Sequence, residues 1–411
     1  MKGRCRNKED ELSVLIRNQK EIDFIKEIGI TKASYFAILY NNRQLTDIEQ
    51  FCCEEKNPVP LGIDTTFNLT DLWLTDTSYR NLRIVKVRDA KHPVFLGPCM
   101  LHFTKDASTF SRFFLGLNAG NPGLRELKAV GVDMEAAIFD GFEANVPGIK
   151  RLVCVRHIKA RDEVKANKLL EKTGKSASVK AKCKIDVIND IYGERNGSCF
   201  EYGLAESHDE NDFNAKLNEL KEKWNKLIPG FFDWFVLKRQ KMFISSVIDS
   251  ARKDLNVEGL YYQNDVESLH SVEKCIQEYT KEDVITVIQN LSKLCDRQDV
   301  EEIRALYGSG SYVLTQQYSK FKVDTKIWHG WSEKKRKDHV KAFRSYRPTL
   351  TDQFTKPKSA GKKPSQKRQK KNPAPDVVED RHRSAEPVSQ SIRFQDPTYV
   401  YYFLLSNNLK R

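Results

Sequence analysis

One aspartate interrupts a run of apolar and β-branched residues in Gly62-Ile63-Asp64-Thr65-Thr66-Phe67-Asn68-Leu69. This stretch predicts a strand in which alternation sends Ile63 and Thr65 to one face and Asp64 and Thr66 to the other. Aspartate is depleted in strands and is costly to bury, so Asp64 needs a partner. Either a neighbouring turn supplies hydrogen bonds to Asp64, or a metal ion binds it. The second alternative makes Asp64 a candidate catalytic residue.

The segments after this strand either alternate in hydropathy or carry apolar side chains at helical spacing. They predict, in order, strands at 82–87 and 94–103, a helix at 108–117, a strand at 127–133, a helix from Glu135, a strand at 151–155 and a helix from His157. The first three strands can pair as an antiparallel meander, and helical crossovers join the later ones. This order is the plan of an RNase H-like domain, an α/β fold with a mixed sheet and helices on both faces.

The remaining regions differ from this core in composition. Strand patterns nearly vanish between about 160 and 255, which predicts a helical insertion, and a short strand at 259–262 precedes a helix that carries Glu267. We expect seven regions: an N-terminal region at 1–55 with a helix over 7–28 and a strand over 34–40, the first part of the RNase H-like core at 56–160, the helical insertion at 161–256, the second part of the core at 257–310, a basic extension at 311–351, a disordered basic linker at 352–393 and an apolar segment at 394–411.

The composition excludes several classes of protein. The chain has 411 residues, 39% hydrophobic and 30% charged, which suits a soluble protein with a sizeable core. No apolar run reaches the length that spans a membrane, so we expect no membrane partner. Charged residues follow the first methionine, which predicts no secretory signal. The nine cysteines have no framework spacing, and we expect reduced thiols in an intracellular protein.

The positive charge is concentrated near the C-terminus. The net charge is +13, and one short tract without acids supplies more than half of the excess through Lys356, Lys358, Lys362, Lys363, Lys367, Arg368, Lys370 and Lys371. Such a tract contacts phosphates non-specifically or acts as a nuclear localisation signal. The alternative is a tail that is merely solvated. We select Lys362, Lys363, Lys367, Arg368, Lys370 and Lys371 as candidate nucleic-acid contacts and expect a nuclear protein.

Three acids stand out by their context. Asp64 lies in a strand, Asp133 ends another strand, and Glu267 lies near the start of a helix. Mg²⁺ prefers hard oxygen ligands and tolerates few protein groups, so it sits between carboxylates and phosphate oxygens. Two such ions about 4 Å apart activate an attacking oxygen and stabilise a leaving one. Asp64, Asp133 and Glu267 therefore predict a catalytic site for phosphoryl transfer with two Mg²⁺ or Mn²⁺ ions.

These acids belong to an ordered set of short motifs. The set comprises Gly62-Ile63-Asp64-Thr65-Thr66-Phe67, Gly131-Val132-Asp133 with Glu135-Ala136, Cys154-Val155-Arg156-His157, and Asn264-Asp265-Val266-Glu267-Ser268. In order and spacing it resembles the Mutator-like (MULE) transposases, members of the DDE superfamily with an RNase H-like catalytic domain. The resemblance covers roughly residues 30 to 290. It implies that Asp64, Asp133 and Glu267 are the metal-binding triad, and that Cys154 and His157 match the Cys-x-x-His motif of the family.

The resemblance implies a DDE transposase that cuts DNA strands and transfers them, with element ends and target DNA as partners and a homo-oligomer as the acting form. The chain departs from the family at Met134, where a glycine is usual, and at Asp265 and His270, where asparagines are usual. It also lacks a zinc-binding set at finger spacing before Asp64. These departures favour a second hypothesis, a transposase-derived DNA-binding or scaffold protein without catalytic activity. A third is an RNase H-like nuclease that acts on RNA–DNA hybrids.

Each candidate has a simpler structural alternative. Glu267 follows Asn264 by three residues, the position of a capping glutamate, and Asp133 has the position of an N-cap. Cys154 and His157 invite a zinc site together with Cys99 and His102, which share their spacing. Residues three apart on a strand face opposite sides, so Cys99 and His102 make a poor ligand pair and we expect no structural zinc. The acids Asp71, Asp76, Glu135 and Asp140 are expected to be bystanders, the first two in a turn after Asp64.

Overall fold

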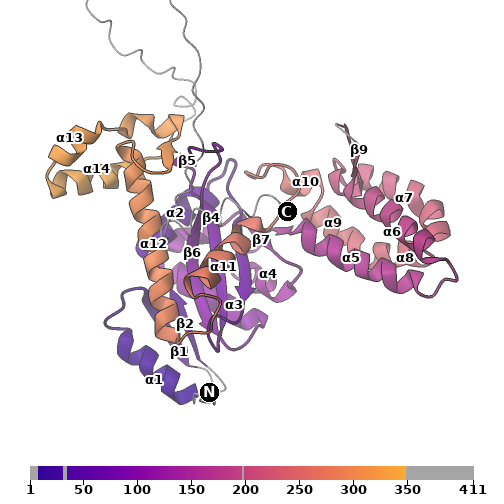
Figure 1. The fold of residues 1–411 in the computed structure, drawn as a ribbon, viewed down its shortest axis with the longest axis horizontal. Coiled ribbons are helices and arrows are strands. Elements are labelled where there is room, and N and C mark those ends of the chain that lie inside the picture. The colour runs from indigo at the N-terminus through magenta and orange to yellow at the C-terminus, as the bar shows by residue number, and fades with distance from the viewer. Residues whose placement is uncertain (1–7, 31–34, 197–198, 349–411) are drawn as a thin grey trace, which may run out of the picture. The chain divides into compact units, whose positions relative to one another are not determined.

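A mixed seven-stranded sheet forms the centre of the computed structural model, which describes residues 8–30, 35–196 and 199–348 (Figure 1). The strand order is β1-β2-β6-β4-β3-β7-β8, and β3 is antiparallel to β4 but parallel to β7. The strands are β1 (Ile25–Ile30), β2 (Tyr35–Leu39), β3 (Leu61–Thr66), β4 (Trp73–Arg80), β6 (Val94–His102), β7 (Ala129–Val132) and β8 (Lys150–Val153). The α/β class and the mixed sheet are therefore confirmed.

Part of the predicted organisation lies outside the described residues. This holds for the linker at 352–393, the segment at 394–411 and the tail candidates Lys362, Lys363, Lys367, Arg368, Lys370 and Lys371. The compact unit that contains the sheet extends to Arg347.

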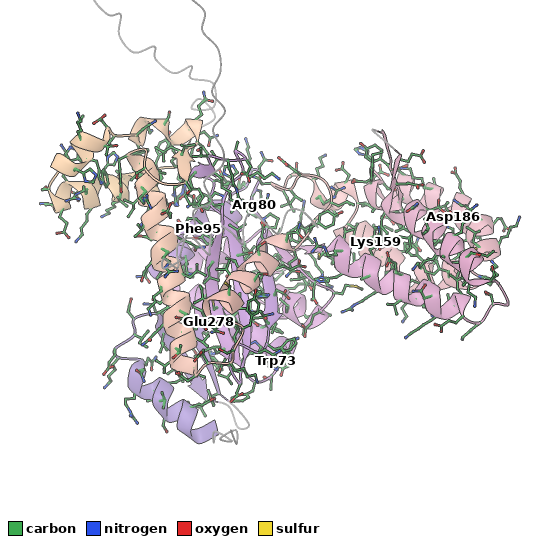
Figure 2. All side chains as sticks on the ribbon, in the orientation of Figure 1. Trp73, Arg80, Phe95, Lys159, Asp186 and Glu278 are labelled. Carbon is green, nitrogen blue, oxygen red and sulfur yellow. The ribbon has the colours of Figure 1, made fainter. Side chains whose placement is uncertain are left out.

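Strand β4 lies in the interior of the sheet, and the sequence prediction missed it. The segment Trp73–Arg80 pairs with both β3 and β6, and Figure 2 labels its two ends. Its central residues are polar yet buried, so no alternation of apolar and polar residues marks the strand. Asp76 was expected in a turn, but it lies in β4 directly opposite Asp64. Its side chain is fully buried.

The predicted strand at 82–87 does not belong to the central sheet. Only β5 (Ile84–Lys86) is extended there, and it pairs with β11 (Tyr312–Leu314) in a separate two-stranded sheet. The meander that follows β3 therefore consists of β4 and β6. The predicted helix over 7–28 is also wrong in its second half, because α1 (Lys8–Asn18) ends early and β1 follows as the edge strand beside β2.

The two faces of the sheet are covered by different helices. The face that carries Ile63, Val130 and Val132 packs against the apolar sides of α2 (Asn42–Cys52), α3 (Ala107–Gly120) and α4 (Ala136–Glu143). A short 3₁₀ helix, η1 (Pro122–Glu126), connects α3 to β7. Alternation sends Asp64 to the opposite face, where α11 (Asn264–Ile276) packs against β3 and β4.

Glycine allows α11 to approach the sheet closely. A Cβ atom at Gly62 would lie 2.9 Å from Val266 Cγ2 on α11 and 2.5 Å from Ser78 Oγ on β4. A Cβ atom at Gly131 would lie 1.8 Å from the hydroxyl of Tyr261, in the segment before α11. The glycines that precede Asp64 and Asp133 thus make room for the chain that carries Glu267.

A mostly helical region separates β8 from α11. Its elements are α5 (Val155–Leu170), α6 (Ala177–Tyr192), a hairpin of β9 (Glu194–Asn196) and β10 (Cys199–Glu201), the 3₁₀ helix η2 (Leu204–Glu206), α7 (Glu210–Leu227), α8 (Phe231–Phe235), the π-helix η3 (Val236–Gln240), α9 (Lys241–Ser246) and α10 (Asp249–Arg252). Figure 2 labels Lys159 on α5 and Asp186 on α6. Trp224, Phe231 and Phe235 are buried in the apolar core of this region. Residues 259–262 form no strand, contrary to expectation.

The last described region packs around α12 (Val284–Leu306). It contains the 3₁₀ helix η4 (Gln316–Phe321), α13 (Thr325–Gly330) and α14 (Glu333–Ser345), with an apolar cluster of Leu306, Tyr318, Trp328 and Phe343. A buried ionic network joins this region to the sheet. Arg83 Nη1 lies 3.0 Å from Glu302 Oε1 on α12, and Arg83 Nη2 lies 2.7 Å from Asp47 Oδ1 on α2. Arg344 Nη2 on α14 contacts Glu302 Oε2 at 2.9 Å.

Two general features concern the described residues only. None of their helices combines the length and the apolar character that a membrane crossing requires. The cysteines whose side chains are described are free thiols.

Candidate active site and metal ligands

Three parallel strands bring three polar side chains to the same level. The register of β3 against β7, continued by two residues, puts Asp64 level with Asp133. The register of β7 against β8, continued by one residue, puts Asp133 level with Cys154. Asp133 and Cys154 directly follow the carboxyl ends of their strands, the edge at which parallel sheets bind ligands. The motifs quoted from the sequence therefore meet at one place.

The carboxylate of Asp64 is mostly buried. Its Oδ1 accepts a hydrogen bond of 2.9 Å from the backbone N–H of Thr65, and its Oδ2 lies 3.7 Å from His270 Nδ1. Burial raises the pKa of Asp64, and the negative charge of Asp133 raises it further, while His270 and the Thr65 N–H oppose both effects. Asp64 and Asp133 are therefore close enough to repel each other.

Asp133 is held by the chain that follows it. Its Oδ1 accepts a 2.6 Å hydrogen bond from the backbone N–H of Glu135. The helix α4 begins at Ala136 with Glu135 as its N-cap residue, so the interpretation of Asp133 as the N-cap is wrong. Glu135 itself forms an ion pair with Lys105 at 2.8 Å.

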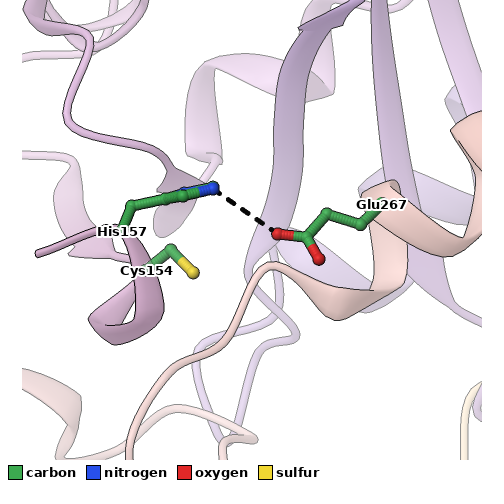
Figure 3. A group of neighbouring side chains, drawn as sticks. All are labelled: Cys154, His157 and Glu267. Atoms are coloured by element: carbon green, nitrogen blue, oxygen red, sulfur yellow. Dashed lines mark ion pairs between the residues drawn. The ribbon is translucent and has the colours of Figure 1, made fainter. Parts of the chain in front are cut away.

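Glu267 faces the start of α5 and does not cap its own helix. The N-cap residue of α11 is Gln263, and no side chain caps this end, so the capping interpretation is wrong. Glu267 Oε2 accepts a 2.8 Å hydrogen bond from Arg156 Nη1, and Oε1 lies 3.6 Å from His157 Nε2 (Figure 3). The first turns of α5 and α11 thus meet through their side chains.

Cys154, His157 and Glu267 form a cluster in which the potential ligand atoms lie within 4.8 Å of one another (Figure 3). Burial favours the neutral thiol of Cys154, but interactions with His157 and with the backbone N–H of Gln263 outweigh burial and lower the pKa of the thiol. The same interaction with Cys154 raises the pKa of His157 against the effect of burial, and Glu267 and Asp133 raise it further. The interaction between Cys154 and His157 therefore shifts the two pKa values toward each other.

The structure brings the three predicted carboxylates toward one histidine. His157 interacts with Glu267 and Asp133, which raise its pKa, and it lowers the pKa of Asp64. In the described part of the chain, no set of ligand atoms within 4.8 Å contains Asp64, Asp133 and Glu267 together. The three carboxylates therefore do not form one set of ligand atoms within 4.8 Å of one another, as a single shared ion would require.

A second cluster lies behind Asp64, and sequence reasoning missed it. Asp76, His270 and Glu273 are all buried, and their ligand atoms also lie within 4.8 Å of one another. The spacing of His270 and Glu273 was a usable signal, because residues three apart share one side of a helix. Asp76 gave no signal, since β4 itself was not predicted.

The other candidate pair, Cys99 and His102, belongs to neither cluster. His102 Nε2 lies 2.7 Å from Thr75 Oγ1, and Nδ1 lies 2.7 Å from the carbonyl oxygen of Thr104. Both ring nitrogens are thus engaged by protein atoms. Burial lowers the pKa of His102 to about 4.

Comparison with known proteins gave no family for this chain. No family model matches the sequence, and no curated protein matches it. The functional interpretation therefore depends on the geometry of the site and on the motifs of the sequence.

Proposed function

We propose that this protein is a DDE-type DNA transposase core of the Mutator-like type, which cuts and joins DNA strands by two-metal phosphoryl transfer. The observation that carries the proposal is the level placement of Asp64 and Asp133 on neighbouring parallel strands, with Glu267 brought to the same edge by α11. These three residues are the acids that the sequence motifs single out.

The strand order supports an RNase H-like core. Starting from β3, the chain forms the antiparallel strands β4 and β6 on one side and the parallel strands β7 and β8 on the other. Helices α3 and α4 connect the later strands. This order agrees with the plan expected from the sequence, although the second strand of the meander is β4.

The donor set fits Mg²⁺ or Mn²⁺. Asp64, Asp133 and Glu267 offer carboxylate oxygens, the ligands that hard divalent cations prefer. The mutual repulsion of Asp64 and Asp133 is the electrostatic condition that a bound cation relieves. Two such ions, held by these residues, would activate the attacking oxygen and stabilise the leaving one.

The residues of the chain position this chemistry. The N–H groups of Thr65 and Glu135 fix the carboxylates of Asp64 and Asp133. Arg156 is more than half exposed beside Glu267, where its guanidinium can contact a DNA phosphate. Water first hydrolyses a phosphodiester at an element end, which frees a 3′-hydroxyl and leaves a 5′-phosphate. The 3′-hydroxyl then attacks a phosphodiester of the target DNA in line and displaces the 3′-oxygen of the target strand.

Basic side chains outside the site provide contacts to DNA. Helix α14 exposes Lys334, Lys335, Lys337 and Lys341, and exposed lysines bind phosphates independently of sequence. The proposal includes the tail lysines as further contacts, a nuclear location and a homo-oligomer as the acting form.

The proposal is tested with Asp64→Asn in the full chain. We expect wild-type protein to nick supercoiled plasmid DNA in the presence of Mn²⁺, and Asp64→Asn to lose nicking while it retains its fold and its DNA binding. Asp71→Asn is the matched control, because Asp71 is exposed after β3 and forms an exposed ion pair with Lys281. Full nicking by Asp64→Asn overturns the assignment.

A second candidate function is a DNA-binding or scaffold protein without catalytic activity. It is favoured by the ion pair between Arg156 and Glu267, which occupies the carboxylate that catalysis requires. Titration with Mn²⁺ separates the two functions. An active core binds Mn²⁺ at a site that Asp64→Asn removes, whereas the inactive protein binds DNA but shows no such site.

A further inference from the structure

We propose that Asp76, His270 and Glu273 bind one divalent transition-metal ion, with zinc as the preferred ion, in a buried site behind Asp64. The site differs from the Cys154 cluster and shares no ligand with the proposed catalytic triad. The inference does not depend on the proposed function.

The three ligands come from two elements that pack against each other. Asp76 lies on β4, while His270 and Glu273 lie one turn apart on α11. His270 Nε2 lies 3.0 Å from Asp76 Oδ2, and all three ligand atoms lie within 4.8 Å of one another. One ion can therefore reach a carboxylate oxygen of Asp76 and Glu273 and the imidazole nitrogen of His270.

The ligand atoms are buried without hydrogen bonds. Asp76 has no exposed surface, and Glu273 is only 4% exposed. Neither oxygen of either carboxylate has a hydrogen-bond partner, and the short contact of His270 Nε2 lacks hydrogen-bond geometry. Buried polar groups in native proteins are hydrogen-bonded or bind a ligand. The five unsatisfied atoms of this one buried cluster favour the binding of a cation.

The charge of the cluster also favours a bound cation. Among the described residues, no lysine or arginine forms an ion pair with Asp76 or Glu273, and His270 is the nearest basic group. Burial, together with the neighbouring Asp76, raises the pKa of Glu273 well above its ordinary value. The pair of carboxylates therefore requires either a shared proton or a cation.

The ligand types select the metal. One imidazole nitrogen with two carboxylate oxygens suits Zn²⁺ better than Mg²⁺, which prefers oxygen ligands alone. The second ring nitrogen of His270 faces Asp64 Oδ2 at 3.7 Å. Metal-bound histidines commonly direct their other N–H at a carboxylate in this manner. An ion bound at Nε2 would thus fix the orientation of the His270 ring, whose Nδ1 faces Asp64.

The first test measures the metal content of purified full-length protein by mass spectrometry. We expect one zinc ion per chain in wild-type protein and in Glu267→Gln. We expect Glu273→Gln and Asp76→Asn to bind zinc at least 10–100-fold more weakly, since loss of even an outer-shell partner costs about that much. Glu267→Gln makes the same charge change on the same helix, but at the Cys154 cluster. Zinc retained in Glu273→Gln, or absent from wild-type protein, overturns the proposal.

The second test needs no variant and so does not depend on the folding of one. Wild-type protein is stripped of metal and loaded with one equivalent of Co²⁺, and its absorption spectrum is recorded. Binding by Asp76, His270 and Glu273 gives cobalt d–d bands without a thiolate charge-transfer band. A thiolate band places the ion at Cys154, and the absence of bound cobalt indicates that Asp76 and Glu273 share a proton. Either of these two results overturns the proposal.

Discussion

Arg156 Nη1 lies 2.8 Å from Glu267 Oε2 and joins the first turn of α5 to the first turn of α11. The helical region between β8 and α11 separates these residues in the sequence. The pair is partly exposed, with 57% of the arginine side chain accessible. Arg156 thus occupies the carboxylate that the proposed function assigns to metal binding.

Replacement of Arg156 by glutamine should tighten the binding of Mn²⁺. The arginine competes with the metal for Glu267, and an exposed ion pair is worth about 0.2–1 kcal/mol. Its removal should therefore raise the affinity by up to about fivefold, which isothermal titration calorimetry can measure. Arg161→Gln is the control, because Arg161 is exposed on the same helix. Equal affinities in the two variants would contradict the competition.

Replacement of Gly131 by alanine should destabilise the protein. The new Cβ atom would lie 1.8 Å from the hydroxyl of Tyr261, so the chain before α11 must shift. Overpacking of this kind costs about 1–3 kcal/mol, measurable by urea denaturation. Gly174→Ala should change stability little, since a Cβ atom there meets no atom within 4 Å. A neutral Gly131→Ala would show that Tyr261 moves freely.

Replacement of Glu302 by alanine should cost about 3–5 kcal/mol of unfolding free energy, because it removes one of the two carboxylates that pair with the buried Arg83. Burial alone would raise the pKa of Glu302, but Arg83, Arg344 and Arg43 lower it to about 2. Denaturation at neutral pH measures the loss. Asp296→Ala, an exposed acid on the same helix, should stay within about 0.5 kcal/mol of wild type. A similar result for Glu302→Ala would contradict the role of the network.

His102 should make stability depend on pH below neutrality. Burial lowers the pKa of His102 from 6.5 to about 4. Between these two pH values, His102 is protonated in the unfolded chain and neutral in the folded chain. Its stabilisation is complete above pH 6.5 and is lost as the pH falls toward 4, with a slope of at most about 1.4 kcal/mol per pH unit. The stability of His102→Gln should show a smaller slope in this window. His329→Gln, at an exposed position on α13, should keep the wild-type slope.

The elements that could be predicted from the sequence are those that local patterns of apolar residues determine. The strand with Asp64, the strand that ends before Asp133 and the helix of Glu267 all follow from alternation or helical spacing, and each is present. Strand β4 was not predicted, because its interior residues are polar and pair with polar residues of neighbouring strands. One example is Thr75 Oγ1, which lies 2.7 Å from His102 Nε2. Tertiary contacts bury these polar residues of β4, and no local pattern in the sequence indicates such contacts.

The candidate site was predictable in part for the same reason. Asp64 lies in β3, and Asp133, Cys154 and His157 follow the ends of β7 and β8. The sheet sets the register of these strands, so the meeting of the four residues could be expected. The partner of Glu267 could not be predicted, because the pair with Arg156 joins two helices that are far apart in the sequence. The cluster of Asp76, His270 and Glu273 required both the missing strand and the face of α11 that packs on it.

The pairing of Asp64 with Asp76 also bears on how the chain matures during its synthesis on the ribosome. Strands β3 and β4 emerge early and set two carboxylates opposite each other. His270, the basic group that contacts both, emerges much later with α11. Gln263, which donates a 2.5 Å hydrogen bond to the carbonyl oxygen of Ile63, arrives with it. The nascent hairpin therefore holds two opposed carboxylates whose basic partner is synthesised only after the whole insertion.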